Sequence, residues 1–117
     1  MATSPYAERR RAPRVMLRCG GDWTEAARSM ACFTGTVSMA GSSIEIEGDH
    51  ILEAGSTGKL RLKLPEPYGT FEIEAKVVWV GNSNGRPTAG LEFSSFLGEA
   101  EKRLGDVIER ALREGRT

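Results

Sequence analysis

Apolar and polar residues alternate one by one along two neighbouring segments of the chain, residues 59–64 and 71–79. In the first segment, leucines occupy every second position between basic side chains. In the second, one face carries only apolar side chains, those of Phe71, Ile73, Ala75, Val77 and Trp79. Successive side chains of a β-strand point to opposite faces, so this period of two predicts half-buried strands that share one core. We therefore expect an antiparallel sheet with Trp79 in its interior.

The other β-prone segments are shorter and are separated by turn-forming residues. Residues 43–47 alternate in the same way, which also indicates a strand. We expect further strands at 15–18, 30–38 and 90–93, a turn at 39–41 and a hairpin loop at 81–87. The polar segment 20–29 predicts a loop, which leaves the surroundings of Trp23 unassigned.

The hydrophobic period lengthens after Gly98. Apolar residues then recur every three to four positions, at Leu104, Val107, Ile108, Ala111 and Leu112. Acidic residues near the start and basic residues near the end suit the dipole of a helix. We predict an amphipathic helix at 98–114. Several short strands followed by one helix indicate a mainly β fold, a small antiparallel barrel that the helix closes or caps.

Size and charge narrow the classes of function. The chain has 117 residues, the usual size of one domain with one core. Its 16 basic and 16 acidic side chains cancel, which argues against a protein that binds nucleic acid over its whole surface. Residues 1–18, however, hold five arginines and one glutamate, a net +4, and the other 99 residues carry −4. Such a basic arm either binds an anion or stays solvated.

The sequence also argues against export and membrane insertion. The longest apolar runs are a few residues, too short to span a bilayer, and residues 1–8 lack the apolar core of a signal peptide. Two cysteines, Cys19 and Cys32, are too few for a disulfide scaffold. We therefore expect a cytoplasmic protein with reduced thiols.

No catalytic constellation emerges from the sequence. His50 is the only histidine, which argues against a metal cluster built with two scattered cysteines. Residues 55–59 look like a phosphate-binding loop, but Leu60 stands where a magnesium-binding Ser or Thr is required. We expect no enzyme, no metal and no cofactor.

Two short motifs carry the functional signal. Arg10 and Arg14 are four residues apart in the arm, where Pro13 stiffens the chain. Arginine suits ligand binding because its planar guanidinium pairs with phosphate oxygens or with the O6 and N7 edge of guanine. The second motif runs from Thr36 through Ser38 to Gly41; on a strand, Thr36 and Ser38 share a face.

In this order the two motifs resemble those of the PilZ domain family, an Arg-x-x-x-Arg arm followed by Asp/Asn-x-Ser-x-x-Gly. Residues 89–93, Ala-Gly-Leu-Glu-Phe, resemble a late strand of the same family, and the resemblance covers about residues 8–113. It implies a six-stranded antiparallel barrel at 15–97, a flexible basic arm at 1–14 and a C-terminal helix at 98–114 of the same domain.

The resemblance also implies a ligand, cyclic di-GMP, and a role for each motif residue. Arg10 and Arg14 would clamp guanine and phosphate, and Arg9 or Arg11 would add a phosphate contact. Ser38 would bond the base, and Gly41 would leave room for it. The arm would order on the ligand and so reshape a surface for a partner protein. We expect no DNA partner and a monomer or weak dimer.

Position 36 departs from the family pattern. Thr36 stands where the family has Asp or Asn, and its hydroxyl is shorter and uncharged. The loss of one good polar contact costs on the order of 1–3 kcal/mol. Two classes of function therefore stay open: a cyclic di-GMP receptor, and a PilZ-type interaction module that no longer binds the nucleotide. Nonspecific binding of nucleic acid by the arm is a third interpretation, which a steep salt dependence would support.

Overall fold

The computed structural model describes residues 12–116. This part of the chain forms seven strands and one helix. The strands are β1 (Val15–Met16), β2 (Gly20–Glu25), β3 (Arg28–Val37), β4 (Gly41–Ile46), β5 (Thr57–Lys63), β6 (Thr70–Ser83) and β7 (Arg86–Phe96). The helix, α2, spans Ala100–Arg113. The predicted mainly β fold with a C-terminal helix is confirmed.

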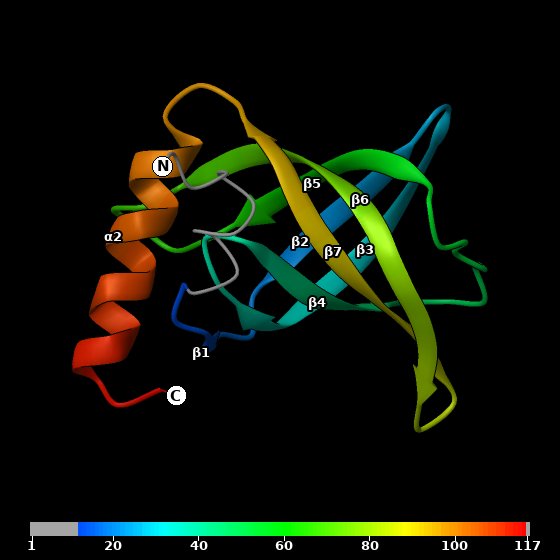
Figure 1. Cartoon of the computed structure of the whole chain (residues 1–117), viewed down its shortest axis with the longest axis horizontal. Coiled ribbons are helices and arrows are strands. Elements are labelled where there is room, and N and C mark those ends of the chain that lie inside the picture. The colour runs from blue at the N-terminus through cyan, green and yellow to red at the C-terminus, as the bar shows by residue number, and fades with distance from the viewer. Residues whose placement is uncertain (1–11, 117) are drawn as a thin grey trace, which may run out of the picture.

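Six of the strands close into an antiparallel barrel. Going round it, the hydrogen-bonded order is β3, β2, β5, β6, β7 and β4, and β4 pairs again with β3. The short strand β1 is added beside the end of β3. Figure 1 shows the barrel obliquely, with α2 at one side and the β6–β7 hairpin projecting at the other. The six-stranded barrel implied by the resemblance is therefore present.

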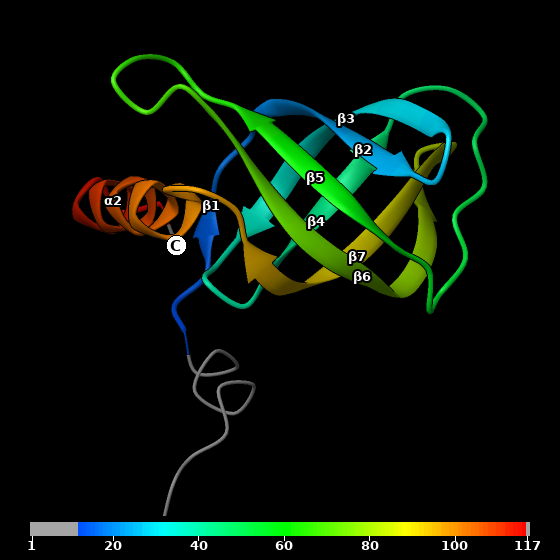
Figure 2. The ribbon, with the colours of Figure 1, turned by 90° about the horizontal axis from the view of Figure 1, so that it is seen from above.

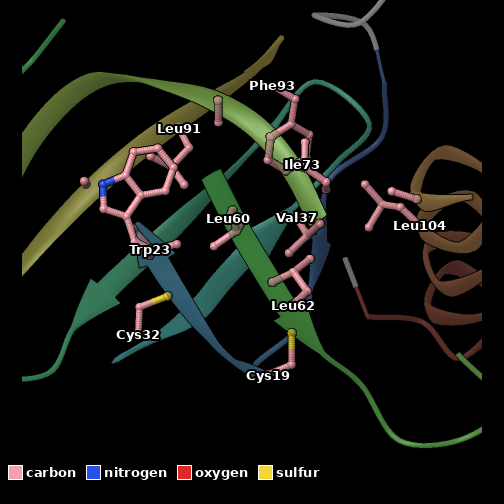
Figure 3. Packing of buried hydrophobic residues seen from close by; sticks show 14 of the residues in the cluster. Cys19, Trp23, Cys32, Val37, Leu60, Leu62, Ile73, Leu91, Phe93 and Leu104 are labelled. Atoms are coloured by element: carbon pink, nitrogen blue, oxygen red, sulfur yellow. The ribbon is translucent and has the colours of Figure 1, made fainter. Parts of the chain in front are cut away.

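The interior of the barrel is filled by the faces that the alternation predicted. Leu60, Leu62, Ile73 and Val77 are all fully buried. They pack with Phe93 and other apolar side chains in one continuous core (Figure 3). The period of two therefore identified the core faces of β5 and of the first half of β6.

Segment 20–29 is not the loop that its polar composition predicted. Gly20–Glu25 and Arg28–Val37 form a hairpin, and Trp23 pairs with Met30 on one side and with Leu60 on the other. Trp23 is completely buried, and its indole nitrogen donates a hydrogen bond to Glu25 Oε1 at 2.8 Å. The prediction failed because Trp23 is the one large apolar residue of β2, so the sequence of this strand shows no alternation.

Trp79 is not in the core, contrary to the prediction from alternation. The register of β6 against β7 shifts between Val77 and Trp79, so the alternation of faces changes there. Trp79 is 48% exposed as a result. The ladder also continues to the pair Ser83 and Arg86. The loop predicted at 81–87 is therefore only a tight turn at the tip of a long hairpin.

Helix α2 closes one end of the barrel (Figure 2). Its buried face contains Leu104, Ile108 and Ala111, which belong to the same core as the strands. Beyond the helix, the main-chain oxygen of Arg116 accepts a hydrogen bond from the Met16 nitrogen at 2.7 Å. The C-terminal end is thereby tied to β1. Within residues 12–116 there is no helix with the length and apolar character needed to cross a bilayer.

The two thiols are buried and unpaired. Cys19 and Cys32 are both free cysteines inside the barrel (Figure 3). Burial raises the pKa of Cys19, and burial together with nearby negative charge raises the pKa of Cys32 to about 12. A thiol with a raised pKa is a poor nucleophile at neutral pH, so both side chains act as small apolar groups.

Candidate ligand-binding face

The candidate site lies on the outside of the barrel, where β3, β4, β7 and β6 lie side by side. Ser43 of β4 is opposite Gly90 of β7, and Gly90 is opposite Trp79 of β6. Thr36 of β3 contacts Ser43 from the other side. These residues form one row across four strands. We call the surface around this row the outer face.

Strand β1 brings the described end of the basic arm to the edge of the outer face. Val15 is paired with Val37, and Met16 is paired with Thr36. Because the two strands are antiparallel, Arg14 precedes Val15 at the same end of the pairing where Ser38 follows Val37. Arg14 is exposed. The sequence-predicted residues Arg9, Arg10 and Arg11 lie outside the described residues.

Ser38 and Gly41 hold a tight turn between β3 and β4. The Ser38 hydroxyl accepts hydrogen bonds from the main-chain nitrogens of Ala40 at 3.0 Å and Gly41 at 3.3 Å. Ser38 itself is only 2% exposed. At Gly41, any Cβ atom would collide with the main-chain oxygen of Leu91. Both residues therefore have a structural role here, and their predicted binding role stays a prediction.

Only Thr36 lies within β3, so the predicted shared strand face of Thr36 and Ser38 stays a prediction. The pairing of β3 with β4 is irregular between Thr34 and Val37, and Ser38 lies past the end of β3. Thr36 turns toward β4, where its nitrogen donates to Ser43 Oγ at 2.9 Å and its own hydroxyl lies 3.3 Å from the same atom. The outer face thus carries a pair of hydroxyls in place of an acidic side chain at position 36.

A hollow of about 290 Å³ opens beside this hydroxyl pair. Its lining is mostly polar, with one apolar side chain (Ile44) and one exposed indole (Trp79); the lining residues are Arg18, Thr34, Gly35, Ser43, Ile44, Glu45, Trp79, Ser83 and Thr88. The indole of Trp79 lies over Gly90, where a Cβ atom would collide with the ring. A flat aromatic surface beside a shallow floor suits a planar ring that stacks.

Sequence reasoning missed Trp79 as a residue of the site. A usable signal was present, because residues 77–80 are four consecutive large apolar residues, which a regular half-buried strand does not accommodate. Such a run indicates a break in the alternation. The shift at Val77 is that break, and it turns Trp79 outward.

Charged groups stand at the rim of the hollow. Arg18 Nη1 lies 3.3 Å from one oxygen of Glu45, and Arg86 Nη1 lies 3.4 Å from the other. The guanidinium of Arg18 also lies 4.5 Å from the centre of the Phe33 ring. Both arginines are more than half exposed, so their remaining N–H groups face solvent. The outer face can therefore donate several hydrogen bonds to an anionic or carbonyl-bearing ligand.

Side chains that can ligate a metal ion do not cluster in the described part of the chain. Among the residues that the structure describes, no group of three or more His, Cys, Asp or Glu side chains is arranged to hold a metal ion. The sole histidine, His50, is exposed in the loop between β4 and β5.

Comparison with known proteins gives a consistent result. A family model described as the PilZ domain matches residues 8–110. No curated protein sequence matches the chain. Among solved structures, the inhibitor of motility MotI/DgrA of Bacillus subtilis superimposes with a TM-score of 0.75 at 20% identity. That superposition covers 91% of this chain and 52% of the other, so this chain spans about half the length of that protein.

Two further structures were solved with a nucleotide. The PilZ domain of YcgR from Escherichia coli, with c-di-GMP, has a TM-score of 0.73 at 18% identity, over 92% of this chain and 95% of that one. The MrkH–c-di-GMP complex of K. pneumonia has a TM-score of 0.74 at 19% identity, over 92% and 53% of the two chains. At these identities the likeness concerns the fold.

Proposed function

The chain belongs to the PilZ domain family, and from that premise we propose that it is a cytoplasmic, non-catalytic receptor for cyclic di-GMP that passes the signal to a partner protein. The observation that supports the proposal is the pairing of β1 with β3, which brings Val15, the residue after Arg14, beside Val37 at the edge of the outer face. Structures of YcgR and MrkH with c-di-GMP share the fold and support the choice of ligand.

Each element of the site has a chemical task in this proposal. Arg14, with Arg10 and either Arg9 or Arg11, supplies guanidinium groups that pair with phosphate and with the O6 and N7 edge of guanine. The indole of Trp79 offers a stacking surface for one base. The Thr36 hydroxyl would serve as a weaker substitute for an acidic side chain. Ser38 and Gly41 shape the turn against which the arm would settle.

The connection of β1 to the C-terminal end suggests how a signal would leave the domain. β1 pairs with β3, and its Met16 nitrogen also donates a hydrogen bond to the main-chain oxygen of Arg116. Ordering of the arm on a ligand would act directly on this two-residue strand. A partner that contacts the end of α2 would then sense whether the ligand is bound.

Calorimetric titration with cyclic di-GMP tests the proposal. We expect low-micromolar binding by the unaltered chain. In Arg14→Ala we expect a loss of about 10- to 150-fold, since a hydrogen bond to a charged group contributes roughly 1.5–3 kcal/mol. Arg113→Ala is the matched control, because Arg113 is also an exposed arginine but lies on α2. No heat from the unaltered chain, or equal loss in both variants, contradicts the proposal.

A second candidate is an interaction module that does not bind the nucleotide. It is favoured by two observations: position 36 lacks a carboxylate, and the Ser38 hydroxyl is buried in its own turn. In that case the titration gives no heat with the unaltered chain, and the barrel and helix surfaces become the place to look for a protein partner.

A further inference from the structure

We infer that Glu45 is the residue that reads guanine, by accepting hydrogen bonds from the N1–H and the 2-amino group of a base stacked on Trp79. This inference rests on the proposed function, because it concerns the same ligand. It assigns base recognition to strand β4, nine residues after the threonine that replaces the acidic residue of the family pattern.

The position of Glu45 is the first argument. Glu45 lies on β4 two residues after Ser43, so both side chains point to the outer face. Glu45 and Trp79 line the same hollow of about 290 Å³. That volume is at the lower end of the roughly 300–1,000 Å³ typical of ligand pockets, so the hollow suits one base and not a whole dinucleotide. A base lying on the indole would present its edge toward the carboxylate.

The second argument is that two ion pairs hold the Glu45 carboxylate in place while its oxygens can still accept further hydrogen bonds. Arg18 contacts one oxygen of Glu45 at 3.3 Å, and Arg86 contacts the other at 3.4 Å. An ionised carboxylate has about four lone-pair sites, so each oxygen keeps an acceptor position. The side chain is 27% exposed, which leaves it accessible from the hollow. The two arginines thus orient the group before a ligand arrives, which reduces the entropic cost of binding.

The third argument is the chemistry of the base. The Watson–Crick edge of guanine carries two adjacent N–H donors, which a single carboxylate accepts together. Adenine has no such pair of donors. Among the described residues that line the hollow, Glu45 is the one acidic side chain. The arginines on either side provide donors for the O6 atom of the same base.

An alternative role for Glu45 is to neutralise Arg18 and Arg86 as part of a surface ion-pair network. Exposed pairs of this kind contribute little, about 0–1 kcal/mol each. A purely structural role predicts that removal of the carboxylate changes affinity for any similar nucleotide by the same factor. Base reading predicts a change that depends on the 2-amino group, and this difference separates the two roles.

The experiment is a cycle of two ligands and two proteins. Cyclic di-GMP and cyclic di-IMP, which lacks the 2-amino groups, are titrated into the unaltered chain and into Glu45→Ala. We expect the unaltered chain to prefer cyclic di-GMP by about 10- to 150-fold, the value of one hydrogen bond to a charged partner. In Glu45→Ala we expect this preference to fall to near unity.

Controls keep the test decisive. Glu47→Ala removes an exposed glutamate just beyond the same strand, outside the hollow, and should retain the preference. If Glu45→Ala does not fold, Glu45→Gln keeps the shape and should reduce the preference less. An undiminished preference in folded Glu45→Ala, or in Glu45→Gln where Glu45→Ala does not fold, overturns the inference alone. Absence of binding by the unaltered chain overturns the proposed function and this inference together.

Discussion

Trp23 and Trp79 lie in two regions of one barrel, Trp23 on the inside and Trp79 on the outside. Each indole packs over a glycine, Trp23 over Gly58 inside the barrel and Trp79 over Gly90 outside it. Trp23 is fully buried, whereas Trp79 is 48% exposed. The inner region uses its aromatic residue to fill volume. The outer region leaves Trp79 about half exposed, which makes its ring available to a ligand.

An exposed apolar side chain does not gain the stabilisation that burial gives. In the outer region, packing does not supply that stabilisation for Trp79. Large exposed aromatic residues on a small domain usually mark a contact surface. On this domain Trp79 lines the hollow of the outer face together with Ser43, where the proposed ligand would contact it.

The largest expected difference between the two regions concerns stability. Trp23→Ala would leave a cavity in the core and should lower the free energy of unfolding by about 3–5 kcal/mol. Trp79→Ala removes a half-exposed ring and should lower it by far less, while weakening binding of cyclic di-GMP. Urea unfolding of both variants measures the stabilities. Equal losses would show that the ring of Trp79 is part of the structural core.

The glycines beneath the two indoles, Gly58 and Gly90, provide a second test of the difference between the inner and outer regions. In Gly58→Ala the added methyl group meets the main-chain oxygen of Thr24 and the ring of Trp23, neither of which can move away. Overpacking of this kind costs about 1–3 kcal/mol, and sometimes more.

In Gly90→Ala the three atoms nearest the methyl group all belong to the ring of Trp79, a half-exposed side chain that has room to move toward solvent. We expect little loss of stability but a weaker affinity for the nucleotide, because the stacking surface is displaced. Unfolding and titration of the same two samples give both quantities. A larger loss of stability in Gly90→Ala than in Gly58→Ala would reverse the assignment of the two regions.

Alkaline pH should lower the free energy of unfolding through a buried residue, Cys32, and by less than the substitutions above. Burial raises the pKa of Cys32 from 9.0 to about 12. Between these values the unfolded chain loses a proton that the folded chain keeps, so stability falls as pH rises above 9. Below pH 9 the thiol is neutral in both states and this effect vanishes.

Cys32→Ala should therefore show a flatter fall in the free energy of unfolding above pH 9 than the unaltered chain. Urea unfolding at pH 7 and at several pH values above 9 measures the two slopes. Arg18→Ala, a change on the outer face, should keep the slope of the unaltered chain. Identical slopes for all three proteins would mean that the thiol ionises freely in the folded state.

The smallest expected effect on stability is that of the charges at the rim of the hollow. Arg18 is 59% exposed, and solvent-exposed ion pairs contribute about 0–1 kcal/mol. Arg18→Ala should therefore change the free energy of unfolding by less than about 1 kcal/mol, although it removes a donor from the proposed site. A larger loss would show that the outer face supports the barrel and is not only a binding surface.

Much of the fold could be predicted because its signals are local. In β5 and in the first half of β6, the alternation of apolar and polar residues indicates which face is buried. In α2, the recurrence of apolar residues every three to four positions indicates a helix. The motif from Thr36 to Gly41 and the arginine at position 14 could likewise be found from spacing. The prediction of these elements required no knowledge of which strand lies beside which.

Prediction failed where long-range pairing decides the outcome. Segment 20–29 has one large apolar residue, and it becomes a strand because β3 and β5 lie on either side of it. The outward turn of Trp79 depends on how β6 is registered against β7. The contacts of Glu45 with Arg18 and Arg86 join residues 27 and 41 positions apart, which no local pattern can indicate.

The sequence by itself determined that this chain forms a mainly β domain with a terminal helix and an arginine-bearing arm, because strand and helix periods and short motifs are properties of neighbouring residues. The tertiary structure alone decided which tryptophan is buried, what the Ser38 hydroxyl bonds, and which carboxylate stands beside the hollow. The physical reason is that closure of a barrel fixes register between distant strands, and register selects the face on which each side chain appears.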